Sequence, residues 1–220
     1  MGDSLLLGLP ENVRHFANDN ISEHLSPEDI ENMKLLAEEK INELLDILFI
    51  DRHNDHNTQG TAKRLAKMYV DEVFKGRYYP QPPTTDFPNA KDLDQIYTLG
   101  PIAVRSTCSH HFVPIIGEAW VGVIPSSRVI GISKFSRLAD WVLSRPQIQE
   151  EAVVQLADLL EEKISPKGLA IVIKAQHMCM SWRGVKEHHN SMTTSVMRGL
   201  FRDDDGARNE FLSIIKGQGY

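Results

Sequence analysis

The order of strand-like and helix-like segments in the second half of the chain most limits its possible folds. Four segments are rich in β-branched residues, which favour strands, and two have a helical pattern. Proline at position 146 separates the two helices, because proline inside a helix breaks it. The order is strand (96–107), strand (115–124), helix (133–143), helix (147–164), strand (169–180) and strand (191–201). This order predicts an α+β fold, with a four-stranded antiparallel sheet, helices on one face, and a closing helix over 207–216.

The first part of the chain predicts helices instead. Residues 1–25 have no sustained period, and we expect a flexible leader there. Ser26 and Pro27 are a typical helix start, and a second helix should begin at Thr61, which can cap it, and end at Gly76. The proline-rich stretch 79–89 predicts an ordered loop. We therefore expect three parts, namely a leader (1–25), a helical region (26–78) and a catalytic domain (79–220).

Charge and hydropathy exclude two classes of protein. The formal net charge of −6 argues against a protein that coats nucleic acid, because affinity for phosphate backbones comes mainly from clustered lysine and arginine. No apolar run approaches the roughly 20 residues that a transmembrane helix needs. We expect a cytoplasmic protein with no membrane partner.

The only two cysteines of the chain each have histidine within three residues. Cys108 and His111 are three residues apart at a predicted strand end, and His177 and Cys179 alternate along a predicted strand, where residues two apart share a face. Thiolate and imidazole suit Zn²⁺ better than Mg²⁺ or Ca²⁺. Three ligands, Cys108, His111 and Cys179, would leave an open position for water, as in catalytic zinc sites.

Two other interpretations of the cysteines stay open. Both could be small buried hydrophobic residues, which is the usual state of a free cysteine. The zinc could also be structural, with His110 or His177 as a fourth ligand. If it is catalytic, His110 and His177 lie close enough to move protons near neutral pH. We assign no role to His188 and His189.

Basic and polar residues at several positions are candidates for anion binding and for base recognition. Ser133, Lys134 and Arg137 lie at the start of a predicted helix, where an anion is favoured. Arg183 and Arg64 would add to a local basic patch in an acidic protein. An amide and a carboxylate, Gln149 and Glu150, could pair with the N–H edge of a guanine. Each of these residues taken alone is more typical of a solvated surface.

Five motifs together resemble GTP cyclohydrolase I. They are Ser-Thr-Cys-Ser-His-His-Phe (106–112), Ile-Gly-Ile-Ser-Lys-Phe-Ser-Arg-Leu (130–138), Arg-Pro-Gln-Ile-Gln-Glu (145–150), His-Met-Cys-Met-Ser-Trp-Arg-Gly (177–184) and Thr-Ser-Val-Met-Arg-Gly-Leu-Phe (194–201). Their order and spacing match those of the family. The likeness extends from about Ser26 to the C-terminus.

The resemblance implies a tunnelling fold in a homodecamer, with sites between subunits. It implies conversion of GTP and water to formate and 7,8-dihydroneopterin triphosphate, the entry to folate and pterin synthesis. By this likeness Cys108, His111 and Cys179 bind zinc, and His110 and His177 transfer protons. The substrate residues would be Glu150 and Gln149 at the guanine and Ser133, Lys134, Arg137, Arg183 and a neighbouring subunit's Arg64 at the triphosphate.

The chain departs from the family at Ser109, where a glutamate is usual, and this change could alter the surroundings of the ligands. Two rival functions follow. One is a zinc-stabilised homologue that binds purine nucleotide without turnover. The other is a related enzyme, such as a pyruvoyl-tetrahydropterin synthase or a nitrile reductase of the queuosine pathway. The first of these enzymes would need a histidine-rich zinc site and the second a nucleophilic cysteine without zinc, so Cys108 and Cys179 disfavour both.

Overall fold

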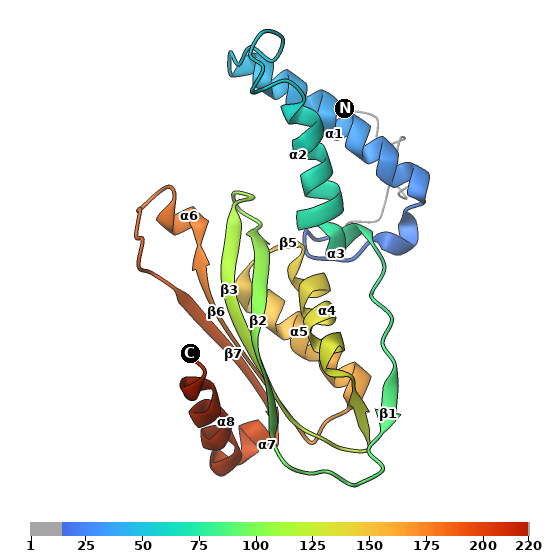
Figure 1. Cartoon of the computed structure of the whole chain (residues 1–220), viewed down its shortest axis with the longest axis vertical. Coiled ribbons are helices and arrows are strands. Elements are labelled where there is room, and N and C mark those ends of the chain that lie inside the picture. The colour runs from blue at the N-terminus through green and yellow to red at the C-terminus, as the bar shows by residue number, and fades with distance from the viewer. Residues whose placement is uncertain (1–14, 220) are drawn as a thin grey trace. The chain divides into compact units, whose positions relative to one another are not determined.

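The computed structural model describes residues 15–219, which fall into two compact units, one ending at Pro80 and one beginning at Gln81. Among these residues, no helix combines the length and apolarity needed to cross a membrane. The two units are described separately below (Figure 1).

The N-terminal unit is helical, and its first long helix begins where the sequence predicts. Ser26 accepts a hydrogen bond from the Asp29 backbone N–H, while the Asp29 carboxylate accepts one from the Ser26 N–H, and Pro27 is the first helical residue. This helix, α1, packs against α2. The elements are η2 (Ser22–His24), α1 (Pro27–Ile47), α2 (Thr61–Lys67), η3 (Met68–Val73) and α3 (Lys75–Tyr78).

The second helix differs from the prediction at both ends. Gly60, in the left-handed region at φ 72°, precedes α2, and the Thr61 side chain does not cap it. A π-helical segment, η3, follows, and Gly76 lies inside α3 rather than ending the helix. The helical path stops at Tyr79, whose backbone is extended at φ −111° and ψ 151° because Pro80 follows it.

Part of the expected leader is tied to the N-terminal unit. The prediction for residues 1–14 lies outside the described residues. Ile21 is 3% exposed, and its N–H donates to the Arg77 carbonyl over 2.8 Å. The Asn20 amide donates to the carbonyl oxygens of Gly76 and Tyr79 at 2.9 and 2.8 Å. These contacts fix the segment against α3.

The C-terminal unit is built on a five-stranded sheet with the order β5-β2-β3-β6-β7. The four long strands are antiparallel to their neighbours, and β5 adds a two-residue parallel pairing beside β2. The strands are β1 (Asp86–Pro88), β2 (Tyr97–Cys108), β3 (Pro114–Ile124), β4 (Arg128–Ile130), β5 (Pro146–Gln147), β6 (Gly168–His177) and β7 (Met192–Gly199). The helices are α4 (Ile132–Leu143), α5 (Gln149–Ile164), α6 (Met178–Ser181), α7 (Leu200–Asp203) and α8 (Asp205–Gly217). The unit is α+β, as predicted.

Helices cover both faces of this sheet, so the expectation of helices on one face is wrong. On one face α4 and α5 bury Ala119, Val121 and their neighbours in the larger core. On the other face α7 and α8 cover Trp120 with Phe201 and Phe211 (Figure 1). Successive residues of a strand point to opposite faces, so β3, which is apolar at consecutive positions, serves both cores. The strand pattern alone does not reveal that α7 and α8 pack on the second face of the sheet.

The proline-rich loop contains a short strand. Residues of β1 pair with β4 in a separate two-stranded sheet, from Asp86 opposite Ile130 to Pro88 opposite Arg128. The Arg128 guanidinium also donates to the Asp86 carboxylate over 2.7 Å. The predicted loop is therefore ordered, but it is not without secondary structure.

Candidate active site

The turn from β2 to β3 holds the first motif in a fixed backbone. Cys108 is the last residue of β2 and is 4% exposed. The Cys108 N–H donates to the Val113 carbonyl, and the Phe112 N–H donates to the Cys108 carbonyl, both over 2.9 Å. The Ser109 N–H donates to the Gln147 carbonyl of β5 over 3.2 Å. The added strand β5 therefore supports the turn that carries Cys108.

Cys179 reaches this turn from a helix and not from a strand. The prediction of a strand through residue 180 is wrong, because β6 ends at His177 and α6 begins at Met178. The Cys179 thiol nevertheless lies beside Cys108. Burial raises the pKa of the Cys179 thiol, and its hydrogen bond and charge interaction with Cys108 raise that pKa further. The structure thus brings the two predicted thiol ligands together.

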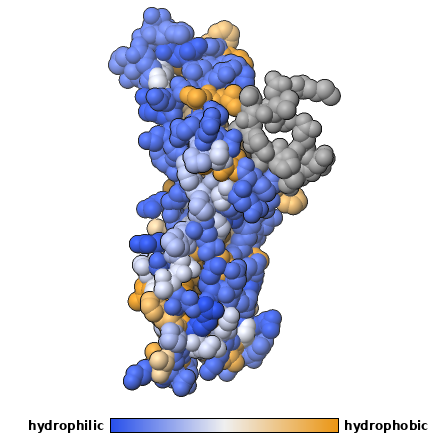
Figure 2. All heavy atoms as spheres, turned by 90° about the vertical axis from the view of Figure 1, so that its right-hand side faces the viewer, coloured by the Kyte–Doolittle hydropathy of each residue, from blue (hydrophilic) through white to orange (hydrophobic). Residues whose placement is uncertain are grey.

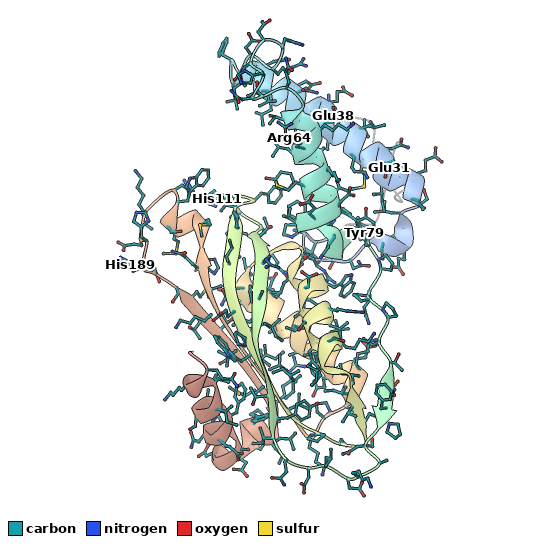
Figure 3. All side chains as sticks on the ribbon, in the orientation of Figure 1. Glu31, Glu38, Arg64, Tyr79, His111 and His189 are labelled. Carbon is teal, nitrogen blue, oxygen red and sulfur yellow. The ribbon has the colours of Figure 1, made fainter. Side chains whose placement is uncertain are left out.

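The two histidines of the turn lie differently. The Cys108 Sγ atom is 3.8 Å from Nδ1 of His110. His111 lies at the tip of the turn (Figure 3), where its Nε2 accepts a hydrogen bond from Nη1 of Arg183 over 3.1 Å. Arginine can only donate, so Nε2 of His111 is the acceptor in this contact. Both imidazoles are exposed and neither is held in a core.

The donor atoms suit a zinc ion, but they are not all gathered. Two adjacent thiols and nearby imidazoles form the donor set that zinc prefers. In the chain from residue 15 to 219, no three histidine, cysteine or acidic side chains already stand together as a metal site. To bind zinc through Nε2, His111 would have to give up its contact with Arg183. Its exposure leaves it free to turn.

His177 and Gln149 form a polar contact near the thiol pair. His177, the last residue of β6, is half-buried, and its Nε2 is 2.9 Å from Oε1 of Gln149. Burial lowers the pKa of His177, and the Glu150 carboxylate opposes that shift. Gln149 is 3% exposed, whereas Glu150, the next residue of α5, is exposed. The two neighbours on α5 therefore face different surroundings.

The expected phosphate-binding residues come from several elements. Ser133 and Arg137 are exposed on α4, whose first turn has no side-chain cap, and Arg183 is exposed after α6. Lys134 donates from Nζ to the Pro83 carbonyl over 3.0 Å. Arg64 belongs to the N-terminal unit, where its guanidinium donates to the Gln59 carbonyl at 3.1 Å. His189 lies in the loop after α6 (Figure 3).

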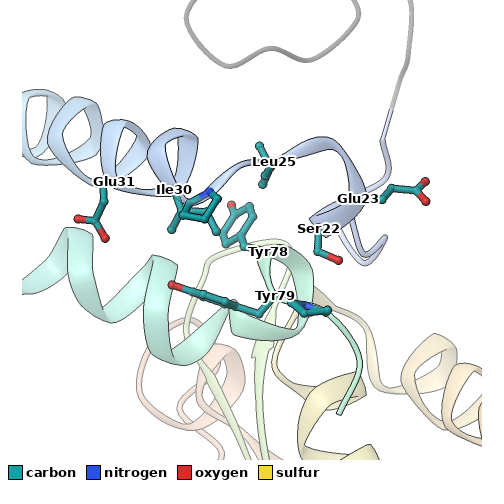
Figure 4. A pocket seen from close by; sticks show the side chains of 9 residues that line it. Ser22, Glu23, Leu25, Ile30, Glu31, Tyr78 and Tyr79 are labelled. Carbon is teal, nitrogen blue, oxygen red and sulfur yellow. The ribbon is translucent and has the colours of Figure 1, made fainter. Parts of the chain in front are cut away.

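A hollow of about 520 Å³ lies in the N-terminal unit, and no predicted site residue lines it (Figure 4). Tyr78, Leu25 and Ile30 give it apolar walls. Its polar groups already have partners. The Tyr79 hydroxyl donates to Asp71 over 2.7 Å, and Glu31 pairs with Lys34 at 2.6 Å. Its lining therefore offers shape but few groups for chemistry.

Sequence reasoning missed two contacts of the site. Thr194 contacts the Gln149 amide, and Arg183 contacts His111. They join residues 45 and 72 positions apart. No local pattern signals contacts over such separations. The Arg183 contact also gives that residue a partner other than the expected phosphate.

Comparisons with known proteins agree with the resemblance. The family model of GTP cyclohydrolase I matches residues 37–216. The GTP cyclohydrolase 1 of Edwardsiella ictaluri is 38% identical over 184 residues, which is 83% of each chain. The enzyme of Yersinia enterocolitica is 35% identical over 192 residues, which is 87% of each chain. That of an Enterobacter species is 36% identical over 189 residues, which is 86% of this chain and 85% of the relative.

A solved structure of the archaeosine synthase QueF-Like covers 55% of this chain and 97% of its own, with a TM-score of 0.37 and 16% identity. That likeness is too weak to bear on the fold. The family match and the relatives, by contrast, extend over most of the chain and include both cysteine motifs. The chain belongs to the GTP cyclohydrolase I family of enzymes.

Proposed function

We propose that this protein converts GTP and water to formate and 7,8-dihydroneopterin triphosphate with the help of a bound zinc ion, as the first step of folate and pterin synthesis. The observation that carries the proposal is the meeting of Cys108 and Cys179 from separate motifs of a chain that matches the family. His110 and His177 flank this pair. The same small region thus offers metal ligands and proton carriers.

We propose Cys108, His111 and Cys179 as the zinc ligands. Their chemistry supports zinc, because thiolates and imidazole are its preferred donors. The contact of His110 with Cys108 keeps His110 open as an alternative imidazole ligand. Zinc, when bound, lowers the pKa of a water molecule and so supplies a nucleophile near neutral pH.

The protein's own residues would bind and orient the nucleotide. Glu150, with an exposed carboxylate, could accept hydrogen bonds from the N–H edge of guanine, and the family likeness adds Gln149. The triphosphate would lie among cations of α4 and the α6 loop, together with Arg64 of a neighbouring subunit. The proposed residues are Ser133, Lys134, Arg137, Arg183 and Arg64. Such a local basic patch matters in a chain with a net charge of −6, because the overall field repels a triphosphate.

His110 and His177 would move protons during the reaction. Opening of the imidazole ring requires a proton on a ring nitrogen, and opening of the ribose requires one at the ring oxygen. We assign the first proton to His177 and the second to His110. Imidazole is the side chain that most often transfers protons near neutral pH.

We also propose the tunnelling fold, the homodecamer and a cytoplasmic location, following the family likeness. In the described part of the chain, β7 pairs only with β6, so one edge of the sheet carries unpaired backbone groups. Such edges are usually covered or paired. Pairing between subunits would satisfy this edge, and the family likeness implies that Arg64 serves a neighbour's site.

The decisive test is product formation. Zinc-loaded protein is incubated with GTP, the product is oxidised, and fluorescent neopterin and formate are measured. Both should appear in equal amounts. A protein with stoichiometric zinc that forms neither would instead be a nucleotide-binding homologue without turnover, and the proposed function would be wrong.

A matched set of histidine variants tests the ligand assignment. We expect His111→Ala to lose zinc, and His110→Ala and His177→Ala to keep zinc while turnover falls by a factor of about 10² to 10⁴. Zinc content is measured by metal analysis after dialysis. Loss of zinc in His110→Ala but not in His111→Ala would exchange their roles, and loss in His177→Ala would indicate a four-ligand structural site.

A further inference from the structure

The Gln149 side chain has no free donor for a substrate. Its amide nitrogen lies within hydrogen-bond distance of three acceptors, which are the carbonyl oxygens of Ile173 and Met192 and the hydroxyl of Thr194, at 3.1, 3.2 and 3.0 Å. An amide group has only two N–H bonds, so these acceptors already use its full donor capacity. At 3% exposure, the side chain is anchored between β6 and β7.

The same contacts settle which end of the amide faces His177. The two backbone carbonyls can only accept, so the nitrogen must point to them and the oxygen must point away. That oxygen is the only atom of the side chain that could accept from the N–H edge of guanine, and it is 2.9 Å from His177 Nε2. Because the amide oxygen can only accept, His177 must donate its Nε2–H. This bond fixes the neutral imidazole as the tautomer whose Nδ1 is free of a proton.

We infer that Gln149 is a positioning residue that holds His177 in one orientation and one tautomer, rather than a contact to the guanine. The inference rests on the proposed role of His177 in proton transfer. With its Nε2–H donated to the Gln149 oxygen, the imidazole presents Nδ1 to the reacting proton that the proposed function assigns to His177. The guanine edge is then read by Glu150, whose carboxylate is exposed and lies at the next position of α5.

Kinetic measurements can distinguish a Gln149 that binds guanine from a Gln149 that positions His177. A residue that binds guanine contributes to nucleotide affinity and to base choice, whereas a residue that orients a proton carrier contributes to the chemical step. Inosine triphosphate lacks the 2-amino group of GTP, so it probes the base contact alone. We compare Gln149→Met, which keeps the length of the side chain but removes both polar atoms, with Glu150→Gln as the matched control.

Gln149→Met should lower kcat by about 10- to 100-fold, less than the loss of the whole imidazole, and leave KM for GTP within about twofold. Its preference for GTP over inosine triphosphate should persist. Glu150→Gln should raise KM and lose that preference. In a His177→Ala background, Gln149→Met should cause no further loss of turnover and no change in the Kd of GTP, because the two residues act as one unit.

The inference is overturned if Gln149→Met raises KM or Kd for GTP by about tenfold or removes the preference for guanine. Should Gln149→Met fail to fold, Gln149→Asn decides the question, because it keeps the amide group but shortens the side chain by one methylene and so weakens its contact with His177. It should lower kcat by about two- to fivefold with KM unchanged, and a rise in KM alone would contradict the inference. Wild-type protein that forms no neopterin would instead refute the proposed function.

Discussion

The candidate site has a buried part and an exposed part, and they are held by different means. Cys108 and Gln149 are 4% and 3% exposed, and the bonds that hold them run to the backbone of the sheet. His110, His111 and Arg183 are exposed on turns and contact mainly one another and the thiols. The buried part therefore arrives with its geometry set, whereas the exposed part can rearrange when metal and nucleotide bind.

The surface of the protein carries both polar and apolar side chains. On the face that Figure 2 shows, most side chains are hydrophilic, and hydrophobic ones form small separate patches. Some apolar side chains near the site are nevertheless exposed, including Phe112 at 48% and Trp182 at 72%. Both belong to the turns that carry the exposed part. Substitutions in the two parts should thus have effects of different size and kind.

The largest effect is expected from Cys108→Ala in the buried part. It removes one proposed thiolate ligand and should abolish zinc retention and lower turnover by about 10³-fold or more. Zinc analysis and neopterin formation measure both effects. Cys108→Ser, with a similar volume, is the control for packing and should lose zinc as well. Full turnover in either variant would remove Cys108 from the metal site.

Arg183→Ala should have the next largest effect, and it acts on the exposed part. Loss of a charge-assisted bond to phosphate, worth about 1.5–3 kcal/mol, should lower kcat/KM for GTP by about 10- to 100-fold. Zinc content should stay the same, because Arg183 is not a ligand. Arg183→Lys keeps the charge and should recover part of the loss. If Arg183→Ala lost zinc instead, its contact with His111 would be the more important one.

The difference between the two parts also explains what the sequence could predict. Local signals sufficed for the helix start at Ser26 and for the long strands, because caps and β-branched runs act within a few residues. They also sufficed to select the two cysteines. They failed for Cys179, which was expected on a strand, because the end of β6 depends on tertiary packing rather than on propensity.

Roles that depend on distant residues could not be predicted. Gln149 reads as a surface amide in the sequence, but its partners at 173, 192 and 194 come from β6 and β7. The packing of α8 on the second face of the sheet depends on Phe211. Its ring lies so close to Gly122 that a Cβ atom added to Gly122 would be 2.5 Å from the ring. Such contacts appear only when separated elements have folded together.

A smaller effect is expected at Phe112, which tests whether the exposed turn stores strain. Its φ of 52° lies in the left-handed region, where a side chain costs about 1 kcal/mol or more. Compared with Phe112→Ala, which also lacks the ring, Phe112→Gly should raise the free energy of unfolding by about 1 kcal/mol. Urea denaturation of the two variants measures the difference. Equal stability would mean that the turn is relaxed.

The smallest effect is expected at Ser109, where the family resemblance leads us to expect glutamate. Among residues 15–219, no hydrogen-bond partner of the Ser109 hydroxyl is found, and its contact with Gln147 is made by the backbone N–H. Ser109→Ala should therefore change turnover by no more than about twofold, which corresponds to about 0.5 kcal/mol. Ser109→Glu adds a negative charge beside the thiols, and comparison of its zinc affinity with that of Ser109→Ala isolates this charge. If Ser109→Glu alone shows a large gain in turnover, the missing carboxylate limits the turnover of the wild-type protein.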